Sequence, residues 1–167
     1  MISEVLSETT LARFAKEVAK YPANQKQSAV MACLAIVQQE NGFVSPASEK
    51  LIADYLGMAP IAVHEVTSFY NMYNQEVTGK YKLNVCTNLP CQLREGGRAL
   101  KHLEQKLGIA MGETTADGYF TLQQCECLGA CADSPVLLVN DRTMCSFMSN
   151  DKLDQLVDGL RAAGDAQ

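Results

Sequence analysis

The chain has 167 residues, of which 47% are hydrophobic, and its formal net charge is −5. This length allows one ordinary domain or two small ones with a substantial buried core. An acidic balance without a basic run argues against nucleic acid as a partner.

The sequence also lacks the segments that would place it in a membrane or export it. The longest apolar stretch, residues 29–37, is too short to span a bilayer. The first residues have neither the basic region nor the apolar region of a secretory signal. We therefore expect a cytoplasmic protein without direct membrane insertion.

Residues 1–76 are predicted to form a small helical bundle. The expected helices run from Thr9 or Thr10 to Tyr21, from Asn24 or Ser28 to Asn41, from Pro46 to Leu56 and from Pro60 to Tyr73. Ser45 and Pro46 have the pattern of an N-cap and a first helical residue. Gly42 and Gly57 directly follow helices, as C-terminal glycines do. Short helices joined by short connections are typical of a bundle, and no catalytic constellation occurs in this segment.

The character of the sequence changes near Val77, and residues 77–167 are predicted to form a second domain. Residues 80–85 alternate between apolar and polar side chains, which is typical of a half-buried strand. The further elements expected are a helix over 90–107, strands over 119–127, 135–140 and 143–148, and a helix from Asn150 or Asp151 to Gly164. The order β-α-β-β-α predicts a thioredoxin-like sandwich, which makes the fold class of the whole chain α/β (α+β).

Two adjacent glycines, Gly96 and Gly97, lie inside the predicted helix over residues 90–107. Each weakens the helix by roughly 1 kcal/mol relative to alanine. Either they let another backbone approach closely, or they mark a tolerated kink.

Four of the seven cysteines stand in two closely spaced pairs. Cys86 and Cys91 form a C-x4-C pattern, and Cys127 and Cys131 form a C-x3-C pattern. Two short loops that each deliver two thiolates suit a 2Fe–2S cluster, in which each iron takes two cysteines. Zinc also accepts four thiolates, but C-x2-C is its usual spacing. The spacing therefore favours the cluster and leaves zinc or a thiol redox site as alternatives.

The start of the second pair is ambiguous, because Cys125 stands two residues before Cys127. On a strand, both side chains would point to the same face. We choose Cys127, because the loop from it to Cys131 makes a compact chelate. Cys33 and Cys145 stand singly among apolar residues and are expected to lie in the core.

The loops that carry the cysteines are expected to supply backbone N–H donors to sulfur. Thr87, Gly129 and Ala130 stand where such donors would stabilise the negative charge of a cluster. Gly129 in addition allows the positive φ with which a loop wraps a metal.

A 2Fe–2S cluster carries one electron at a time and cannot handle a hydride alone. The sequence has neither a G-x-G-x-x-G pattern opening a helix nor a Walker motif. We therefore expect an electron carrier that depends on another protein for its oxidation chemistry.

With these residues established, the chain closely resembles the small thioredoxin-like 2Fe–2S subunit of respiratory NADH:quinone oxidoreductase (complex I), over nearly its whole length. Residues 63–73, with the pattern V-x-x-V-x-x-F-Y-x-M-Y, look like the fourth helix of that family's bundle. Residues 86–94, C-T-x-x-P-C-x-L-R, look like its first ligand pair, and residues 126–131, E-C-L-G-A-C, look like its second. Ser134 stands where the family usually has alanine, which is a small departure.

The resemblance implies that Cys86, Cys91, Cys127 and Cys131 are the ligands of one 2Fe–2S cluster. It implies a partner subunit that binds FMN and NADH. The cluster would exchange an electron with the flavin while lying to the side of the main chain of clusters. It also implies association with the other complex I subunits, peripheral to the cytoplasmic face of the inner membrane.

Other functions are compatible with parts of this pattern. Equivalent subunits of soluble NAD-linked hydrogenases and formate dehydrogenases resemble the chain too, and the ligands do not separate them from complex I. A thioredoxin-type disulfide oxidoreductase would need C-x-x-C at the strand–helix junction, where this chain has two more residues. A zinc-binding adaptor is a further alternative of a different class.

Overall fold

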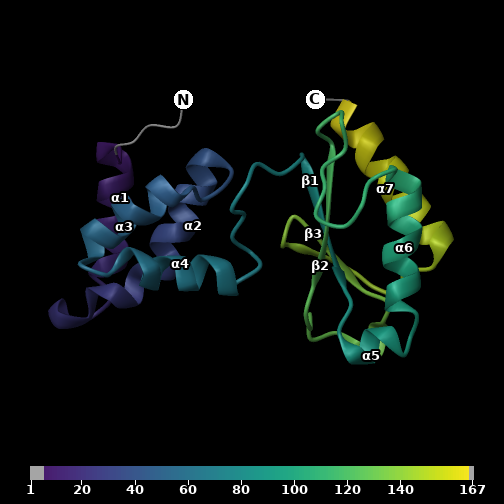
Figure 1. Ribbon diagram of the computed structural model, residues 1–167, viewed down its shortest axis with the longest axis horizontal. Helices are drawn as coiled ribbons and strands as arrows, with labels where there is room; N and C mark the ends of the chain where they lie inside the picture. Colours follow the sequence, from purple (N-terminus) through teal and green to yellow (C-terminus); the bar gives the residue numbers. More distant parts are fainter. Residues whose placement is uncertain (1–5, 166–167) are drawn as a thin grey trace. The chain divides into compact units, whose positions relative to one another are not determined.

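The structure is a computed structural model that describes residues 6–165 (Figure 1). The chain forms two compact units, and the division falls between Val77 and Thr78. Each unit has a hydrophobic core of its own. No helix in the described part of the chain is both long enough and apolar enough to cross a membrane.

Over residues 6–77, the first unit is a bundle of four α-helices and one 3-10 helix. These elements are α1 (Glu8–Val18), η1 (Ala23–Ala29), α2 (Val30–Asn41), α3 (Pro46–Leu56) and α4 (Pro60–Phe69). Phe14, Leu34 and Ile52 are fully buried at the centre of its core. The N-terminal helical bundle that the sequence predicts is confirmed.

Local capping signals fix the ends of α2 and α3 as the sequence predicts. The Ser48 N–H donates to the Ser45 hydroxyl oxygen at 3.1 Å, and Pro46 stands in the first turn of α3. Gly42 and Gly57 follow α2 and α3 with φ values of +82° and +68°. Glycine adopts this left-handed conformation at little cost.

The start of α1 differs from the prediction of a cap at Thr9 or Thr10. Ser7 is the N-cap, because its hydroxyl oxygen accepts a hydrogen bond from the Thr10 N–H at 3.0 Å. Three neighbouring hydroxyl residues can all serve as caps, so residue type alone does not choose among them.

The second and fourth predicted helices are also corrected. The second begins as the 3-10 segment η1 and becomes α-helical only at Val30. Helix α4 ends at Phe69, because Tyr70 adopts an extended backbone conformation. Tyr73 lies beyond the helix, where it is buried and its hydroxyl donates to the Met31 carbonyl oxygen at 2.8 Å.

Within residues 78–165, the second unit is built on a four-stranded sheet. Its strands are β1 (Tyr81–Cys86), β2 (Phe120–Cys125), β3 (Leu137–Val139) and β4 (Thr143–Cys145), in the order β2-β1-β3-β4. Strands β1 and β2 are parallel, whereas β3 runs antiparallel to β1 and β4. Helices α6 (Gly96–Leu107) and α7 (Asn150–Asp165) cover one face of the sheet (Figure 1). This arrangement confirms the thioredoxin-like fold.

Strand β1 is buried on both faces, so the prediction of a half-buried strand is wrong. Leu83 and Val85 pack in the core with side chains of α6 and α7. On the other face, Lys82 is 2% exposed and Asn84 is 1% exposed. The carboxylate of Asp141, in the β3–β4 turn, lies 2.6 Å from Lys82 Nζ and also accepts a hydrogen bond from the Asn84 amide. Ion pairing therefore compensates for the burial of the Lys82 ammonium group.

The predicted helix over residues 90–107 is interrupted. It forms the short helix α5 (Leu89–Gln92) and the longer α6, separated by a turn in which Glu95 has a φ of +68°. A Cβ at Gly96 would lie 2.9 Å from the Cys91 carbonyl oxygen and 3.0 Å from the Cys86 carbonyl oxygen. Of the two interpretations of this glycine pair, close approach of another backbone is therefore the one that applies to Gly96.

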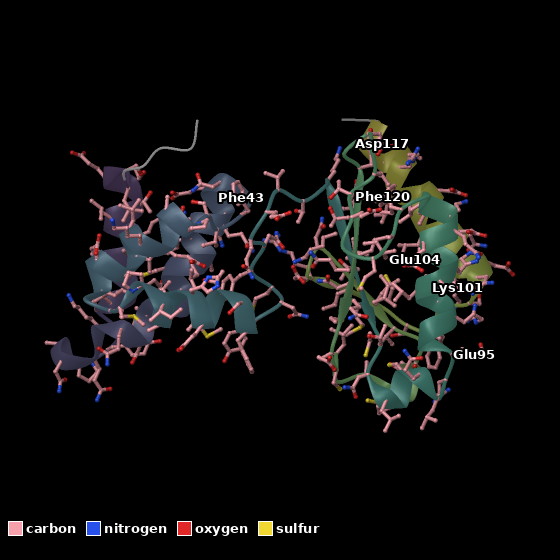
Figure 2. The ribbon with its side chains drawn as sticks, viewed as in Figure 1. Phe43, Glu95, Lys101, Glu104, Asp117 and Phe120 are labelled. Carbon is pink, nitrogen blue, oxygen red and sulfur yellow. The ribbon has the colours of Figure 1, made fainter. Side chains whose placement is uncertain are left out.

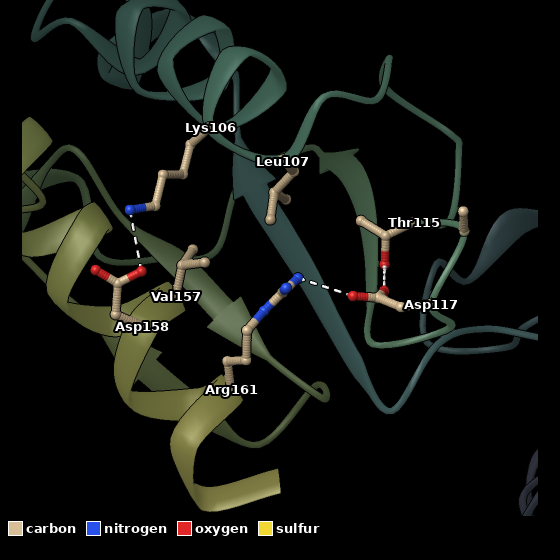
Figure 3. Close-up of a pocket in the computed structure, with 8 residues that line it drawn as sticks. Lys106, Leu107, Thr115, Asp117, Val157, Asp158 and Arg161 are labelled. Carbon is tan, nitrogen blue, oxygen red and sulfur yellow. Dashed lines mark hydrogen bonds and ion pairs between the residues drawn. The ribbon is translucent and has the colours of Figure 1, made fainter. Parts of the chain in front are cut away.

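Ion pairs tie α7 to its neighbours, and Figure 3 shows two of them. The Lys106 ammonium of α6 lies 3.0 Å from the Asp158 carboxylate, and the Arg161 guanidinium of α7 lies 2.9 Å from the Asp117 carboxylate in the loop before β2. These side chains line a hollow of about 480 Å³ that no cysteine borders. Because its charged groups are paired with one another, we assign this hollow a structural role.

We expect Asp117→Asn to lower the thermal unfolding temperature near neutral pH. Hydrogen bonds from the Thr115 hydroxyl and the Tyr119 N–H, together with Arg161, lower the pKa of Asp117 below its ordinary value. A carboxylate whose pKa is lowered by folding stabilises the protein above the unfolded-state pKa of about 3.9, and this contribution is lost as the pH falls through the folded-state pKa. The difference in unfolding temperature between wild type and variant should therefore be largest near neutral pH and decrease in acid.

The control for this experiment is Asp54→Asn, which changes an exposed carboxylate of α3 and should leave the unfolding temperature nearly unchanged at every pH. Thermal unfolding followed by circular dichroism over a pH series measures both variants. A difference at Asp117 that stays undiminished at the lowest pH where both proteins fold would contradict the ion-pair interpretation.

We expect Glu95→Gly to raise the free energy of unfolding by about 1 kcal/mol. Glu95 lies at the turn where α6 begins (Figure 2), and a side chain in the left-handed conformation costs about 1–2 kcal/mol. Part of that gain is offset, because glycine gives the unfolded chain more freedom. The exposed ion pair with Arg98, at 3.0 Å, contributes little.

Urea denaturation measures this difference. Gln105→Gly is the matched control, since Gln105 is exposed within α6 and glycine there should cost about 1 kcal/mol. Equal destabilisation by both glycine variants would show that Glu95 is not strained.

Candidate metal centre

The two cysteine loops leave the sheet at the same edge. Cys86 is the last residue of β1 and Cys125 the last residue of β2, and the two are directly paired in the parallel register. From β1 the chain enters α5, which carries Cys91. From β2 it enters the loop of Cys127 and then the 3-10 helix η2 (Cys131–Asp133). Parallel pairing therefore brings together two segments that are far apart in the sequence.

The four cysteines selected from the sequence meet at this edge. The thiols of Cys86 and Cys91 are hydrogen-bonded to each other. The sulfur atoms of Cys127 and Cys131 lie 3.9 Å apart. The Leu128 N–H donates to the Cys86 sulfur, so the second loop reaches over the first pair.

The two pairs differ in their exposure to solvent. Cys86 and Cys91 are each 1% exposed and belong to a small apolar cluster of buried side chains. Cys127 is exposed and Cys131 is half-buried. One pair thus lies inside the protein and the other lies at its surface.

Two of the thiols at this edge, those of Cys86 and Cys131, have a raised pKa and so resist ionisation. Burial raises the pKa of Cys86, although hydrogen bonds from the Asn88 and Leu128 N–H groups act in the opposite direction. The pKa of Cys131 is also raised, first by its hydrogen bond with Cys127 and then by burial. A metal binds the thiolate, so metal binding here has to release protons.

The backbone donors expected around the second pair are present at Gly129. Its N–H lies 3.3 Å from the Cys127 sulfur, and its φ is +76°. Both expectations for this glycine are confirmed. A donor in this position stabilises negative charge on the sulfur.

The donors around the first pair differ from the expectation. The Thr87 N–H does not point to sulfur, because it donates to the Cys125 carbonyl oxygen at 3.1 Å. Asn88 and Leu128 supply the N–H groups that reach the Cys86 sulfur. Every residue type except proline has a backbone N–H group. The only sequence signal for these two donors is therefore that Asn88 and Leu128 stand beside the cysteines.

The sulfur atoms are arranged as two pairs. Each iron of a 2Fe–2S cluster takes two thiolates. Two cysteine pairs at one sheet edge therefore fit the donor set of such a cluster.

The three remaining cysteines lie outside these pairs. Burial raises the pKa of Cys33 to about 12, and this residue lies in the core of the first unit as expected. Cys145 is half-buried against the core of the second unit, and burial raises its pKa as well. Cys125 is 5% exposed and packs in the apolar cluster of Cys86 and Cys91, and burial raises its pKa to about 12.

A family model described as "Thioredoxin-like [2Fe-2S] ferredoxin" matches residues 14–161. The match covers both units and both cysteine pairs. The chain belongs to the thioredoxin-like [2Fe–2S] ferredoxin family. This membership accounts for the sheet order and for the clustered cysteines at its edge.

The chain is also similar to named subunits of NADH-quinone oxidoreductases and to a related NADH dehydrogenase component. NADH-quinone oxidoreductase subunit 2 of Thermus thermophilus is 42% identical over 144 residues, which make up 86% of this chain and 80% of the relative. An NADH-quinone oxidoreductase subunit of Rickettsia conorii is 39% identical over 86% of both chains. The mitochondrial NADH dehydrogenase [ubiquinone] flavoprotein 2 of Dictyostelium discoideum is 38% identical over 90% of this chain and 62% of its own length.

A solved structure with the same fold is that of an NAD+-reducing [NiFe]-hydrogenase in the air-oxidised state. The TM-score is 0.66 at 18% identity, over 81% of this chain. The matched region is 23% of the hydrogenase chain. At this identity the similarity concerns the fold alone.

We expect Cys127→Ala to abolish the visible absorbance of the purified protein and Cys125→Ala to retain it. Cys127 faces Cys131 at 3.9 Å and accepts the Gly129 N–H, whereas Cys125 ends β2. Alanine is chosen because a serine oxygen can itself bind iron. Visible absorbance and iron content per chain measure the outcome, and the opposite result would transfer the ligand assignment to Cys125.

Proposed function

We propose that this chain is an electron-transfer subunit of an NADH:quinone oxidoreductase and holds one 2Fe–2S cluster. The observation that carries the proposal is the meeting of two cysteine pairs at one sheet edge, in a chain about 40% identical to subunits of that enzyme. The proposed ligands are Cys86, Cys91, Cys127 and Cys131.

The residues at this edge are suited to holding a negatively charged redox group. Four thiolates bind the irons, and the N–H groups of Asn88, Leu128 and Gly129 stabilise charge on sulfur. Bound there, the cluster supplies one-electron transfer. We assign the cluster to a domain of residues 77–167 and docking to the helical bundle of residues 1–76.

The chemistry of NADH requires a second protein. A hydride carries two electrons, and the sequence has no nucleotide-binding motif to receive it. A partner subunit that binds FMN and NADH would split the pair of electrons and exchange one of them with the cluster of this chain. The proposed partners are this flavoprotein and the other complex I subunits, at the cytoplasmic face of the inner membrane.

A second candidate function is the equivalent diaphorase subunit of a soluble NAD-linked hydrogenase. The shared fold with an NAD+-reducing hydrogenase favours it, at the level of fold. Purification of the native complex separates the two candidates, because quinone-reducing membrane subunits accompany the chain in one and a hydrogenase accompanies it in the other.

We expect the isolated protein to be red-brown, with about two irons and two sulfides per chain. NADH alone should leave it oxidised, and dithionite should reduce it by one electron. Addition of an FMN-binding partner subunit should make NADH an effective reductant, as followed by visible absorbance and electron paramagnetic resonance. A colourless protein that contains zinc, or reduction by NADH without a partner, would contradict the proposal.

A further inference from the structure

We propose that Asn88 and Arg94 are positioning residues that hold the second cysteine loop, residues 126–132, in place over the buried cysteine pair. This inference rests on the proposed 2Fe–2S site and goes on to say what determines how long that site retains its metal group. Arg94 and Glu126 both belong to the sequence patterns around the ligand pairs, although neither is a proposed ligand.

Each end of the second cysteine loop is bound by a side chain from the first cysteine segment. The Asn88 side-chain amide donates to the Glu126 carboxylate at 2.9 Å, and Glu126 directly precedes the second cysteine pair. The Arg94 guanidinium donates to the Ala132 carbonyl oxygen at 2.9 Å, and Ala132 directly follows that pair. The two hydrogen bonds therefore lie on either side of the second pair.

The residues that donate these hydrogen bonds have backbones tied to the buried pair. The Asn88 N–H donates to the Cys86 sulfur. The Arg94 N–H donates to the Cys91 carbonyl oxygen at 3.0 Å. Because Cys86 and Cys91 are each 1% exposed, both side chains start from a well-packed part of the protein. They connect this buried segment to an exposed one.

The second cysteine loop is exposed on its outer side and covers the buried pair on its inner side. Four of its seven residues are exposed, namely Glu126, Cys127, Gly129 and Ala132. Leu128 and Ala130 are partly buried and pack against the apolar cluster that contains Cys86. Exposed loops open more readily than a packed core does. Opening of this loop would uncover the buried pair and move the second pair away from it.

Closure of the loop determines whether the two cysteine pairs stay together. Each iron of a 2Fe–2S cluster takes two thiolates, so the sulfur atoms of both pairs must keep their positions at the same time. A hydrogen bond at each end of the loop makes opening less frequent. Loss of one such hydrogen bond should make opening about three- to tenfold more frequent.

Release of iron to an excess of chelator, followed without oxygen as the loss of visible absorbance, tests the Asn88–Glu126 hydrogen bond in the full-length protein. We expect Asn88→Ala and Glu126→Ala each to release iron about three- to tenfold faster than wild type. The double variant should be no faster than either single variant, because both changes remove the same bond. The Asn88 side chain makes no cap bond to α5, so its loss leaves that helix end unchanged.

Glu126→Gln separates the hydrogen bond from the charge. It removes the negative charge but keeps an acceptor oxygen, and we therefore expect it to release iron at the wild-type rate. Arg94→Met should release iron about three- to tenfold faster than wild type, because it removes the donor to Ala132. The matched control is Arg142→Met, which changes an exposed arginine in the turn before β4 and should keep the wild-type rate.

Wild-type release rates in both Glu126→Ala and Arg94→Met would overturn the inference. Release from Glu126→Gln as fast as from Glu126→Ala, or additive effects in the double variant, would overturn it as well. These results would leave the 2Fe–2S site intact. A wild-type protein without iron and visible absorbance would contradict the proposed function together with this inference, and it is recognised before chelator is added.

Discussion

The parallel pairing of β1 with β2 is the constraint on which the cysteine site depends. It fixes Cys86 opposite Cys125, and both loops then leave the sheet at one edge. A slip of one residue would turn every β2 side chain to the opposite face and move the start of the second loop by about 3.3 Å. The register is stabilised by the core, since Phe120 and Leu122 are fully buried there. Burial of these two side chains therefore helps to position cysteines that belong to a different apolar cluster.

The same edge sets a conflict between burial and charge. Burial raises the pKa of the Cys86 thiol and so disfavours the thiolate that a metal needs. This side chain packs as a small apolar group in the cluster at the sheet edge. Iron bound there would resolve the conflict, because its positive charge would compensate for the thiolates and the released protons would go to solvent. Backbone N–H groups add to this compensation without bringing a titratable charge into the site.

Much of the fold and of the candidate site could be predicted from local signals. Ser45, Pro46 and Gly57 specify the ends of α3 because capping depends on the few residues at a helix end. The spacing within each cysteine pair is local in the same sense, since a short loop determines whether two sulfurs can chelate one iron. The β-α-β-β-α order follows from element types alone, which is why the sheet could be predicted without its register.

The remaining features depend on contacts between distant residues. Lys82 has the sequence pattern of a solvent-facing strand residue, yet Asp141 pairs with it in the interior. The turn at Glu95 carries a glutamate in a conformation that favours glycine, so residue type pointed to the neighbouring glycines instead. The N–H groups of Asn88 and Leu128 are invisible in a sequence, because every residue except proline has one.

The division of the site into a buried and an exposed half follows from how its two loops are built. The first loop turns directly into α5 and places its cysteines in a buried apolar cluster, whereas the second loop has Gly129 at a φ of +76° and leaves Cys127 exposed. A carrier buried on all sides would be insulated from its partner, and one exposed on all sides would lose its cluster to solvent attack. In the proposed function, the enclosed pair would retain the metal group, and the surface pair would give electrons a short route out of the protein. The difference between the two loops would thereby let one sheet edge both hold the metal group and exchange electrons with a partner.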